Sequence, residues 1–130
     1  MYKFSRRSRD KLYRCEEPLI TLFEKVIEYT DCTIFCGYRD RRTQQQAFEE
    51  GRSKVQFPDS KHNHRPSSAV DAGPYPIDWE AIKRWYMFVG IVRGVASMLD
   101  IPIRCGADWD GDMIVKDQNF HDLPHVELIK

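Results

Sequence analysis

The chain has 130 residues, of which 42% are hydrophobic and 31% are charged, proportions that are ordinary for a single soluble globular domain. Twenty basic and twenty acidic residues cancel, so the overall charge gives no reason to expect nucleic acid as a partner. No stretch approaches the ~18 consecutive apolar residues of a membrane span, and no apolar segment follows the basic N-terminal residues as it would in a secretory signal. Four cysteines without a CxxC pair favour reduced thiols and synthesis in the cytosol.

The first half of the chain is predicted to form helix, strand and helix, after a basic N-terminal run that we expect on a solvated helix face. Residues 17–29 carry apolar side chains at three- and four-residue steps, which is the period of an amphipathic helix, and Pro18 suits its first turn. Residues 32–38 are rich in β-formers and predict a strand. Asp40 is a good N-cap and Gly51 a good C-terminal stop, so a second helix is predicted between them.

The second half predicts a long loop, a long helix and three short strands. Residues 52–68 carry glycine, proline and serine, and a loop of that length is often functional. Strands are predicted at residues 69–71, 103–105 and 125–128, and a helix at residues 78–99 with an aspartate as its N-cap. Helices followed by scattered short strands predict one α+β domain over residues 1–130, with a small antiparallel sheet packed with helices.

Two groups of metal-ligating side chains lie far apart in the sequence. The first is Ser60-Lys61-His62 followed by Ala69-Val70-Asp71, and the second is Asp122-Leu123-Pro124-His125. A loop that leaves and returns can bring His62 and Asp71 together, and the alternation after His125 puts Glu127 on the same strand face as that histidine. Two histidines and a carboxylate can hold a catalytic zinc ion with one position left for water. Either histidine alone is more often an ordinary surface or core residue, so the prediction depends on both groups forming one site.

With these motifs the chain resembles the zinc peptidases of peptidoglycan, a family that includes D-alanyl-D-alanine carboxypeptidases and phage L-alanyl-D-glutamate endopeptidases. The family motifs S-x-H, A-x-D and D/E-x-x-H match the two groups above. Its G-x-R, with a glutamine five residues after the arginine, matches Gly37-Tyr38-Arg39 and Gln44, and the segment 106–111 is similar to phage members. Three ordered motifs are more specific than any single one. The resemblance covers residues 5–128 and implies the hedgehog/DD-peptidase fold.

The resemblance also implies a role for each matching residue. A Zn²⁺ ion would be held by His62, Asp71 and His125, and Asp122 would take a proton from the bound water and deliver it to the leaving amine.

Arg39 would orient a substrate carboxylate or carbonyl, and Gln44 and Ser60 are weaker candidates for the same task. From the residues alone, Arg39 could instead serve as a helix cap or in a surface ion pair.

The spacing of the first motif departs from the family pattern. The commonest family spacing from histidine to aspartate is seven residues, whereas His62 and Asp71 are nine apart and the usual glycine between them is missing. His64 has the seven-residue spacing. We predict His62 as the ligand because Ser60 precedes it, and His64 as a loop residue beside the site.

The run Asp108-Trp109-Asp110-Gly111-Asp112 invites comparison with a calcium-binding loop. An EF-hand would need glycine at its sixth position and glutamate at its twelfth, where this chain has Met113 and Asn119. We therefore expect an acidic turn beside the site, with calcium binding of another kind left open.

Taken together, the sequence favours a zinc peptidase that cuts the L-alanyl-D-glutamate bond of the peptidoglycan stem as a phage endolysin. It would be a monomer, made in the cytoplasm of the bacterial host and acting on the cell wall after release. Two alternatives stay open: a D-alanyl-D-alanine carboxypeptidase, and a zinc-holding binding or virion protein without turnover. Retention of Asp122 beside His125 disfavours the last.

Overall fold

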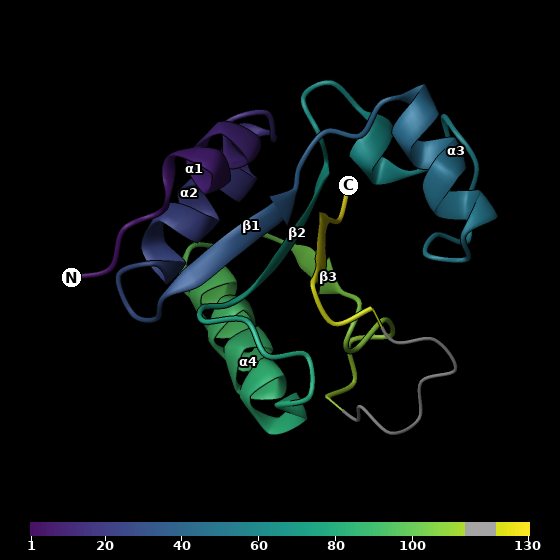
Figure 1. The fold of residues 1–130 in the computed structure, drawn as a ribbon. Coiled ribbons are helices and arrows are strands. Elements are labelled where there is room, and N and C mark those ends of the chain that lie inside the picture. Colours follow the sequence, from purple (N-terminus) through teal and green to yellow (C-terminus); the bar gives the residue numbers. More distant parts are fainter. Residues whose placement is uncertain (114–121) are drawn as a thin grey trace.

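The structure is a computed structural model and describes residues 1–113 and 122–130 (Figure 1). Its helices are α1 (Arg6–Leu12), α2 (Glu17–Val26), α3 (Arg41–Glu49) and α4 (Ile82–Met98), with a 3₁₀ turn, η1 (Lys61–Asn63). Its strands are β1 (Cys32–Cys36), β2 (Ala69–Pro74), β3 (Ile103–Cys105) and β4 (His125–Leu128). The described residues therefore confirm the α+β class and the small antiparallel sheet.

The four strands form one sheet in the order β1-β2-β4-β3, and every neighbouring pair is antiparallel. The order brings the C-terminal strand β4 against β2, although about fifty residues separate them in the chain. Asp71 on β2 stands opposite His125 on β4, and also opposite Cys36 at a register irregularity in β1. The sheet thus joins the two motifs that the sequence keeps apart.

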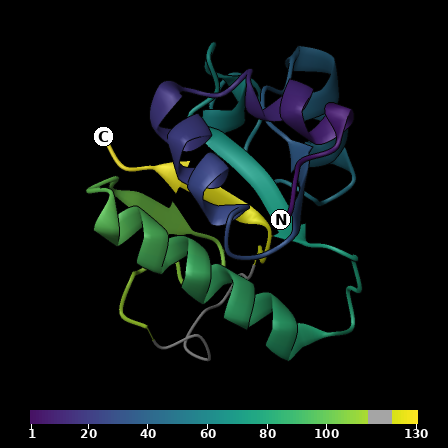
Figure 2. The same ribbon diagram turned by 90° about the vertical axis from the view of Figure 1, so that its left-hand side faces the viewer.

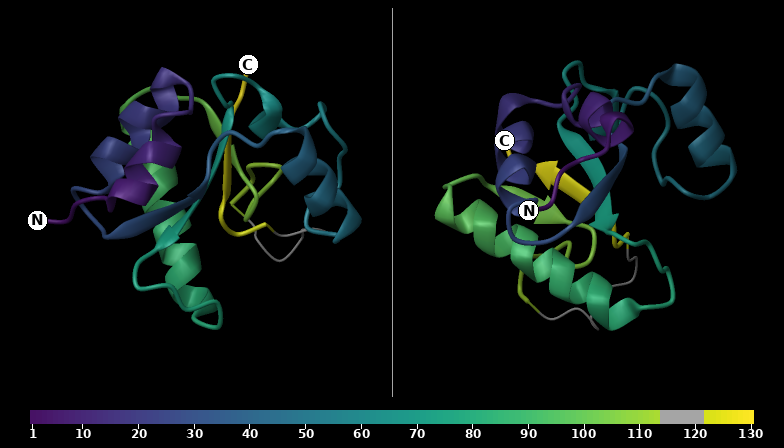
Figure 3. Two further views of the ribbon diagram at one scale, coloured as in Figure 1. Left: turned by 45° about the horizontal axis from the view of Figure 1, so that its top comes forward. Right: turned by 60° about the vertical axis from the view of Figure 1, so that its left-hand side comes forward.

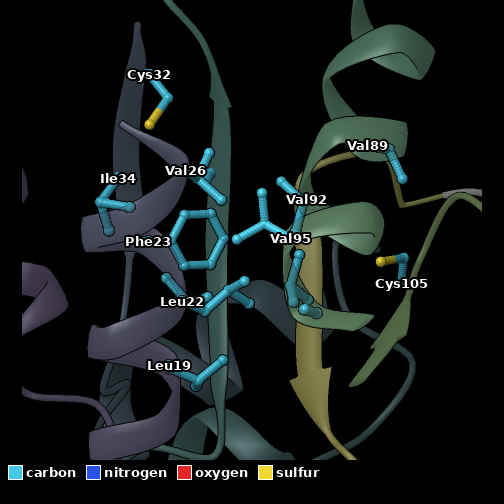
Figure 4. Close-up of a cluster of buried hydrophobic side chains, with 14 of the residues drawn as sticks. Leu19, Leu22, Phe23, Val26, Cys32, Ile34, Val89, Val92, Val95 and Cys105 are labelled. Carbon is cyan, nitrogen blue, oxygen red and sulfur yellow. The ribbon is translucent and has the colours of Figure 1, made fainter. Parts of the chain in front are cut away.

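Helices α1, α2 and α4 cover one face of the sheet, and α3 lies on the other side (Figures 2 and 3). The core fills the space between α2, α4 and the strands, where Phe23 of α2 points toward Val92 of α4 (Figure 4). The apolar side chains of α2 follow the predicted three- and four-residue steps, and Leu19, Leu22 and Val26 are fully buried. Because the core occupies one face of the sheet, the other face is left to form a site.

Several element boundaries differ from those predicted. Helix α2 ends at Val26 rather than at residue 29, and β1 ends at Cys36 because the carbonyl of Gly37 accepts side-chain hydrogen bonds instead of extending the ladder. Helix α4 begins at Ile82 rather than at Asp78. The Asp78 carboxylate accepts the backbone N–H of Glu80, so it caps a turn ahead of the helix.

Other local predictions are confirmed. Asp40 is the N-cap of α3 and its side chain accepts the backbone N–H of Thr43, while Gly51 follows the helix with a positive φ of 78°. The basic N-terminal run forms α1, and most of its residues are exposed. The four cysteines are free thiols. In the described part of the chain, no helix combines the length and the apolar character that crossing a membrane requires.

Two glycines provide a matched test of the fold. A Cβ at Gly94, on the exposed side of α4, would meet nothing within 4 Å, whereas a Cβ at Gly37 would lie 2.4 Å from the carbonyl oxygen of Lys11. Gly94→Ala should raise the free energy of unfolding by about 1 kcal/mol, because alanine is the better helix former. Gly37→Ala should lower it by about 1–3 kcal/mol, because backbone has to move. Urea denaturation of both variants measures the difference, and equal stabilities would contradict the packing around Gly37.

Candidate active site

Three side chains from three elements converge on the open face of the sheet. The Oδ1 atom of Asp71 lies 3.2 Å from Nε2 of His62 and 3.5 Å from Nδ1 of His125. One ligand atom from each residue lies within 4.8 Å of the others, so the three could hold one metal ion. The β2–β4 pairing supplies two of these residues and η1 supplies the third. We call His62, Asp71 and His125 the metal trio.

A backbone carbonyl group fixes the orientation of the His62 imidazole. Its Nδ1 lies 2.8 Å from the carbonyl oxygen of Gly37, which can only accept a hydrogen bond, so Nδ1 carries the proton and Nε2 is left facing Asp71. The turn that presents His62 is closed by a capping box, in which Ser60 accepts the backbone N–H of His62 and Asn63 accepts that of Ser60. Ser60 therefore has a structural role in addition to lying on the groove described below.

The imidazole of His125 is fixed in a similar way by a carboxylate. Its Nε2 lies 2.8 Å from Oε1 of Glu127, which leaves Nδ1 toward Asp71, as the predicted strand alternation requires. Glu127 is itself held by Arg104 at 2.8 Å and by Lys61 at 3.2 Å. Burial acts to raise the pKa of Glu127, but the hydrogen bond with His125 and the Arg104 contact outweigh it and lower that pKa to about 2. Glu127 is thus a permanent anion that orients the imidazole of His125.

The electrostatics of the metal trio favour a positive charge between its members. Nε2 of His62 and Oδ1 of Asp71 are buried without a hydrogen-bond partner, a rare state for buried polar atoms. Burial acts to lower the pKa of His62, but the Asp71 carboxylate prevails and raises it to about 10. In return, and against its own burial, the pKa of Asp71 falls below its ordinary value because of His62. A divalent metal ion would satisfy both orphaned atoms, so these residues fit a metal site.

Asp122 lies beside the metal trio without belonging to it. Its backbone N–H donates to Gly106 at 3.1 Å, and its carbonyl accepts the N–H of His125 at 3.1 Å, which fixes the turn into β4. A Cβ at Gly106 would lie 2.1 Å from the Asp122 carbonyl, so this close approach needs glycine. Burial, followed by the Asp71 carboxylate, raises the pKa of Asp122 above its ordinary value. A carboxylate with a raised pKa is suited to accept a proton.

The predicted substrate-binding residues Arg39 and Gln44 contact one another. Nη1 of Arg39 donates to the Gln44 side chain at 2.9 Å, and Nη2 lies 3.5 Å from Oδ2 of Asp71. Gln44 is fully buried, and its amide nitrogen donates to Ser53 and to the carbonyl of Val55, both at 2.8 Å. Arg39 lines the groove but Gln44 does not, so we infer that Gln44 positions Arg39 rather than contacting substrate.

The metal trio and Asp122 line one groove with a volume of about 910 Å³. Its lining also includes residues 51–55 after α3 and the aromatic side chains of Phe35, Trp79 and Trp109. Charged, polar and aromatic groups around a candidate metal centre are what a hydrolytic site for an extended, polar substrate requires.

Comparison with known proteins agrees with this geometry. The family described as phage L-alanyl-D-glutamate peptidase matches residues 1–129. The chain belongs to this family. The peptidase is also similar in fold to the crystal structure of the Serratia marcescens L-Ala D-Glu endopeptidase ChiX. The TM-score is 0.76 with 21% identity, over 99% of this chain and 90% of that one. A search of curated proteins found no match.

His64, the alternative ligand with the family's usual spacing, lies outside the metal trio of the peptidase. It is exposed, and its Nδ1 lies 2.8 Å from the hydroxyl oxygen of Ser68. The longer loop between His62 and Asp71 turns His64 outward after η1 ends. The geometry therefore brings His62, and not His64, together with Asp71 and His125.

The acidic run after β3 forms a turn, as its sequence suggests. Asp108, Asp110 and Asp112 could bring carboxylate oxygens within 4.8 Å of one another. Asp108 is buried, and its Oδ2 accepts from Arg93 at 2.7 Å and from the backbone of Met113 at 2.8 Å. These contacts give the turn a structural role in the peptidase. The position of Asn119, used in the comparison with an EF-hand, lies outside the described residues.

Three residues of the site were not singled out by sequence. Gly106 was noted only as part of a segment similar to phage members, and its contact with Asp122 depends on the sheet. Lys61 stands inside the S-x-H motif, but nothing in the sequence pairs it with Glu127. Arg104 faces Glu127 across the β3–β4 register, so only the strand pairing could have indicated it.

The two histidines of the first motif give a direct test of the ligand set. His62→Ala should abolish metal retention, because it removes a buried ligand atom aimed at Asp71, whereas His64→Ala should keep nearly all of the metal. Elemental analysis of the purified variants gives the answer, with melting temperature as a control for folding. Loss of the metal in His64→Ala but not in His62→Ala would show that this assignment is reversed.

Proposed function

We propose that the peptidase is a zinc-dependent hydrolase of the L-alanyl-D-glutamate bond in the peptidoglycan stem, acting as a phage endolysin. The observation that carries the proposal is the convergence of two histidines and a carboxylate with two orphaned, buried ligand atoms, beside a carboxylate of raised pKa. Zinc is the metal that this nitrogen and oxygen donor set suits in hydrolytic enzymes. The family description supports the bond, and it disfavours a D-alanyl-D-alanine carboxypeptidase.

In the proposed mechanism His62, Asp71 and His125 would hold the zinc ion. When bound, the metal would supply a Lewis acid for the scissile carbonyl and a water of lowered pKa. Asp122 takes the proton from the attacking water and returns it to the nitrogen of D-glutamate as the peptide bond breaks. Because its pKa is raised, the carboxyl group of Asp122 can serve in turn as base and as acid.

Arg39 is the residue we assign to substrate orientation. Its guanidinium is held by Gln44 and Asp71 and lies on the groove, where its remaining donors can meet a substrate carboxylate or carbonyl. D-glutamate in the stem carries a free carboxylate next to the scissile bond, which fits a fixed cation. Ser60, also on the groove, is a second candidate for this contact.

A small domain without a membrane-crossing helix among its described residues suits an enzyme that is made in the host cytoplasm and reaches the wall after release. We propose that it acts there as a monomer on peptidoglycan. A non-catalytic wall-binding or virion protein would not need the half-buried carboxylate of Asp122 beside the metal trio.

Asp122→Asn separates catalysis from metal binding. The variant should keep its zinc and its melting temperature, because among the described residues it is the backbone of Asp122 that makes the hydrogen bonds of the turn. Its turnover should fall on the order of a hundredfold or more, the usual contribution of a general base. The measurements are zinc content, thermal unfolding and release of peptide from purified peptidoglycan, with wild type and Asp122→Asn side by side.

Near-normal hydrolysis by Asp122→Asn would refute the assigned role. Attention would then move to Glu127, the other carboxylate of the second motif, which contacts His125.

A further inference from the structure

Three aromatic rings form a stack at one part of the groove. The ring centroids of Trp79 and Trp85 are 4.7 Å apart, and that of Phe35 lies 5.5 Å from Trp79 and 6.4 Å from Trp85, all in stacked orientations. Trp85 is fully buried, and its indole N–H donates to the carbonyl of Asp78 at 3.0 Å. Trp79, in contrast, is 55% exposed although it packs on this buried ring. Packing of the protein interior accounts for the buried Trp85. It does not account for the second tryptophan, Trp79, whose ring is exposed to solvent.

The stack packs against β2, the strand that carries Asp71 of the metal trio. Gly73 is two residues after Asp71 on β2, so the two positions share one face of the sheet, roughly 7 Å apart along the strand. A Cβ at Gly73 would lie 2.3 Å from the Trp85 ring and 3.0 Å from the Phe35 ring. Only glycine lets the aromatic stack lie this close to the sheet. Phe35 and Trp79 consequently line the same groove as the metal trio.

Charge is distributed unevenly along this groove. Of the five cations on its lining, Arg39, Arg52 and Lys54 belong to α3 and the segments on either side of it, near the start of β2 (Figure 1). The other two, Lys61 and Arg104, are paired with Glu127. Trp79 belongs to the segment that leaves the end of β2. The neighbours of Trp79 in the chain are Asp78 and Glu80, both acidic. Carboxylates of a stem peptide would therefore be attracted to the α3 side and repelled from the aromatic side.

The substrate has a matching asymmetry. On the carboxyl side of the scissile bond the stem carries the D-glutamate carboxylate and further charged residues. On the amino side a single L-alanine separates the scissile bond from the N-acetylated sugar of the glycan strand. This sugar is uncharged, because its carboxyl group forms the amide bond with L-alanine. One residue spans about 3.5 Å, so the sugar falls within reach of an aromatic surface that begins about 7 Å from Asp71.

From this match we propose that Phe35 and Trp79 form a subsite for the N-acetylated sugar that bears the stem peptide. The subsite sets the direction of binding, with the glycan over the aromatic stack and the D-glutamate side toward Arg39. The exposed ring face of Trp79 covers the apolar face of the sugar, and the buried Trp85 keeps that ring in place. The inference rests on the proposed function, because it names which part of that substrate lies at each end of the groove.

Two soluble substrates test the subsite. One is the N-acetylmuramoyl stem tripeptide, and the other is the same tripeptide with an acetyl group in place of the sugar. For the wild type, kcat/KM should be roughly tenfold higher for the substrate with the sugar than for the acetylated tripeptide. A gain of this size is within the binding free energy expected from one aromatic contact and the surface area that it buries. In Trp79→Ala and Trp79→Gln the ratio of the two kcat/KM values should fall toward one, whereas Trp79→Phe should keep most of it.

Tyr29→Ala is the matched control, because Tyr29 is 56% exposed and does not line the groove. It should show the wild-type ratio and the wild-type melting temperature. A wild-type ratio near one, or a ratio unchanged in Trp79→Ala, would overturn the subsite while leaving the proposed function intact. Failure of the wild type to cut either substrate between L-alanine and D-glutamate would remove the proposed function and the subsite with it.

Discussion

The constraint on which the site depends is the Asp71 carboxylate, which has one buried oxygen and lies between two histidines. An unpaired charge in this position would be unfavourable, so the surrounding structure has to supply positive charge and hold it in place. The antiparallel pairing of β2 with β4 does so by setting His125 directly opposite Asp71, and η1 adds His62 from the long loop. The fold brings these groups together, and a divalent ion would make the arrangement favourable.

The rest of the site follows from holding those two imidazoles in one orientation. Gly37 fixes His62 through its carbonyl, and Glu127, anchored by Arg104 and Lys61, fixes His125. Both contacts leave the ligand nitrogens facing Asp71, which is the usual way in which outer groups prepare a metal centre. Gly106 then lets the turn that carries Asp122 approach the sheet closely, so that the carboxylate proposed as the base lies beside the metal trio without belonging to it.

Sequence reasoning reached the α+β class and most elements, and it grouped His62, Asp71 and His125, whose side chains do converge, because periodicity, caps and motif spacing are local signals. It did not reach what depends on strand pairing. Arg104 faces Glu127 only across the β3–β4 register, and Gln44 proved to be buried behind Arg39. The start of α4 was placed too early because Asp78 looks like a cap, while its backbone carbonyl accepts the indole N–H of Trp85. Likewise, Gly73 carries no signal until the aromatic stack is seen above it.

The central claim is that a zinc ion held by the metal trio lets this chain cut between L-alanine and D-glutamate. The most direct measurement is mass spectrometry of purified peptidoglycan digested by the native protein, the chelated protein and the chelated protein after zinc is restored, with zinc content determined for each. We expect stem fragments that begin at D-glutamate, their loss on chelation and their return with about one zinc per chain. Undiminished cleavage by the metal-free protein, or fragments cut at D-alanine instead, would contradict it.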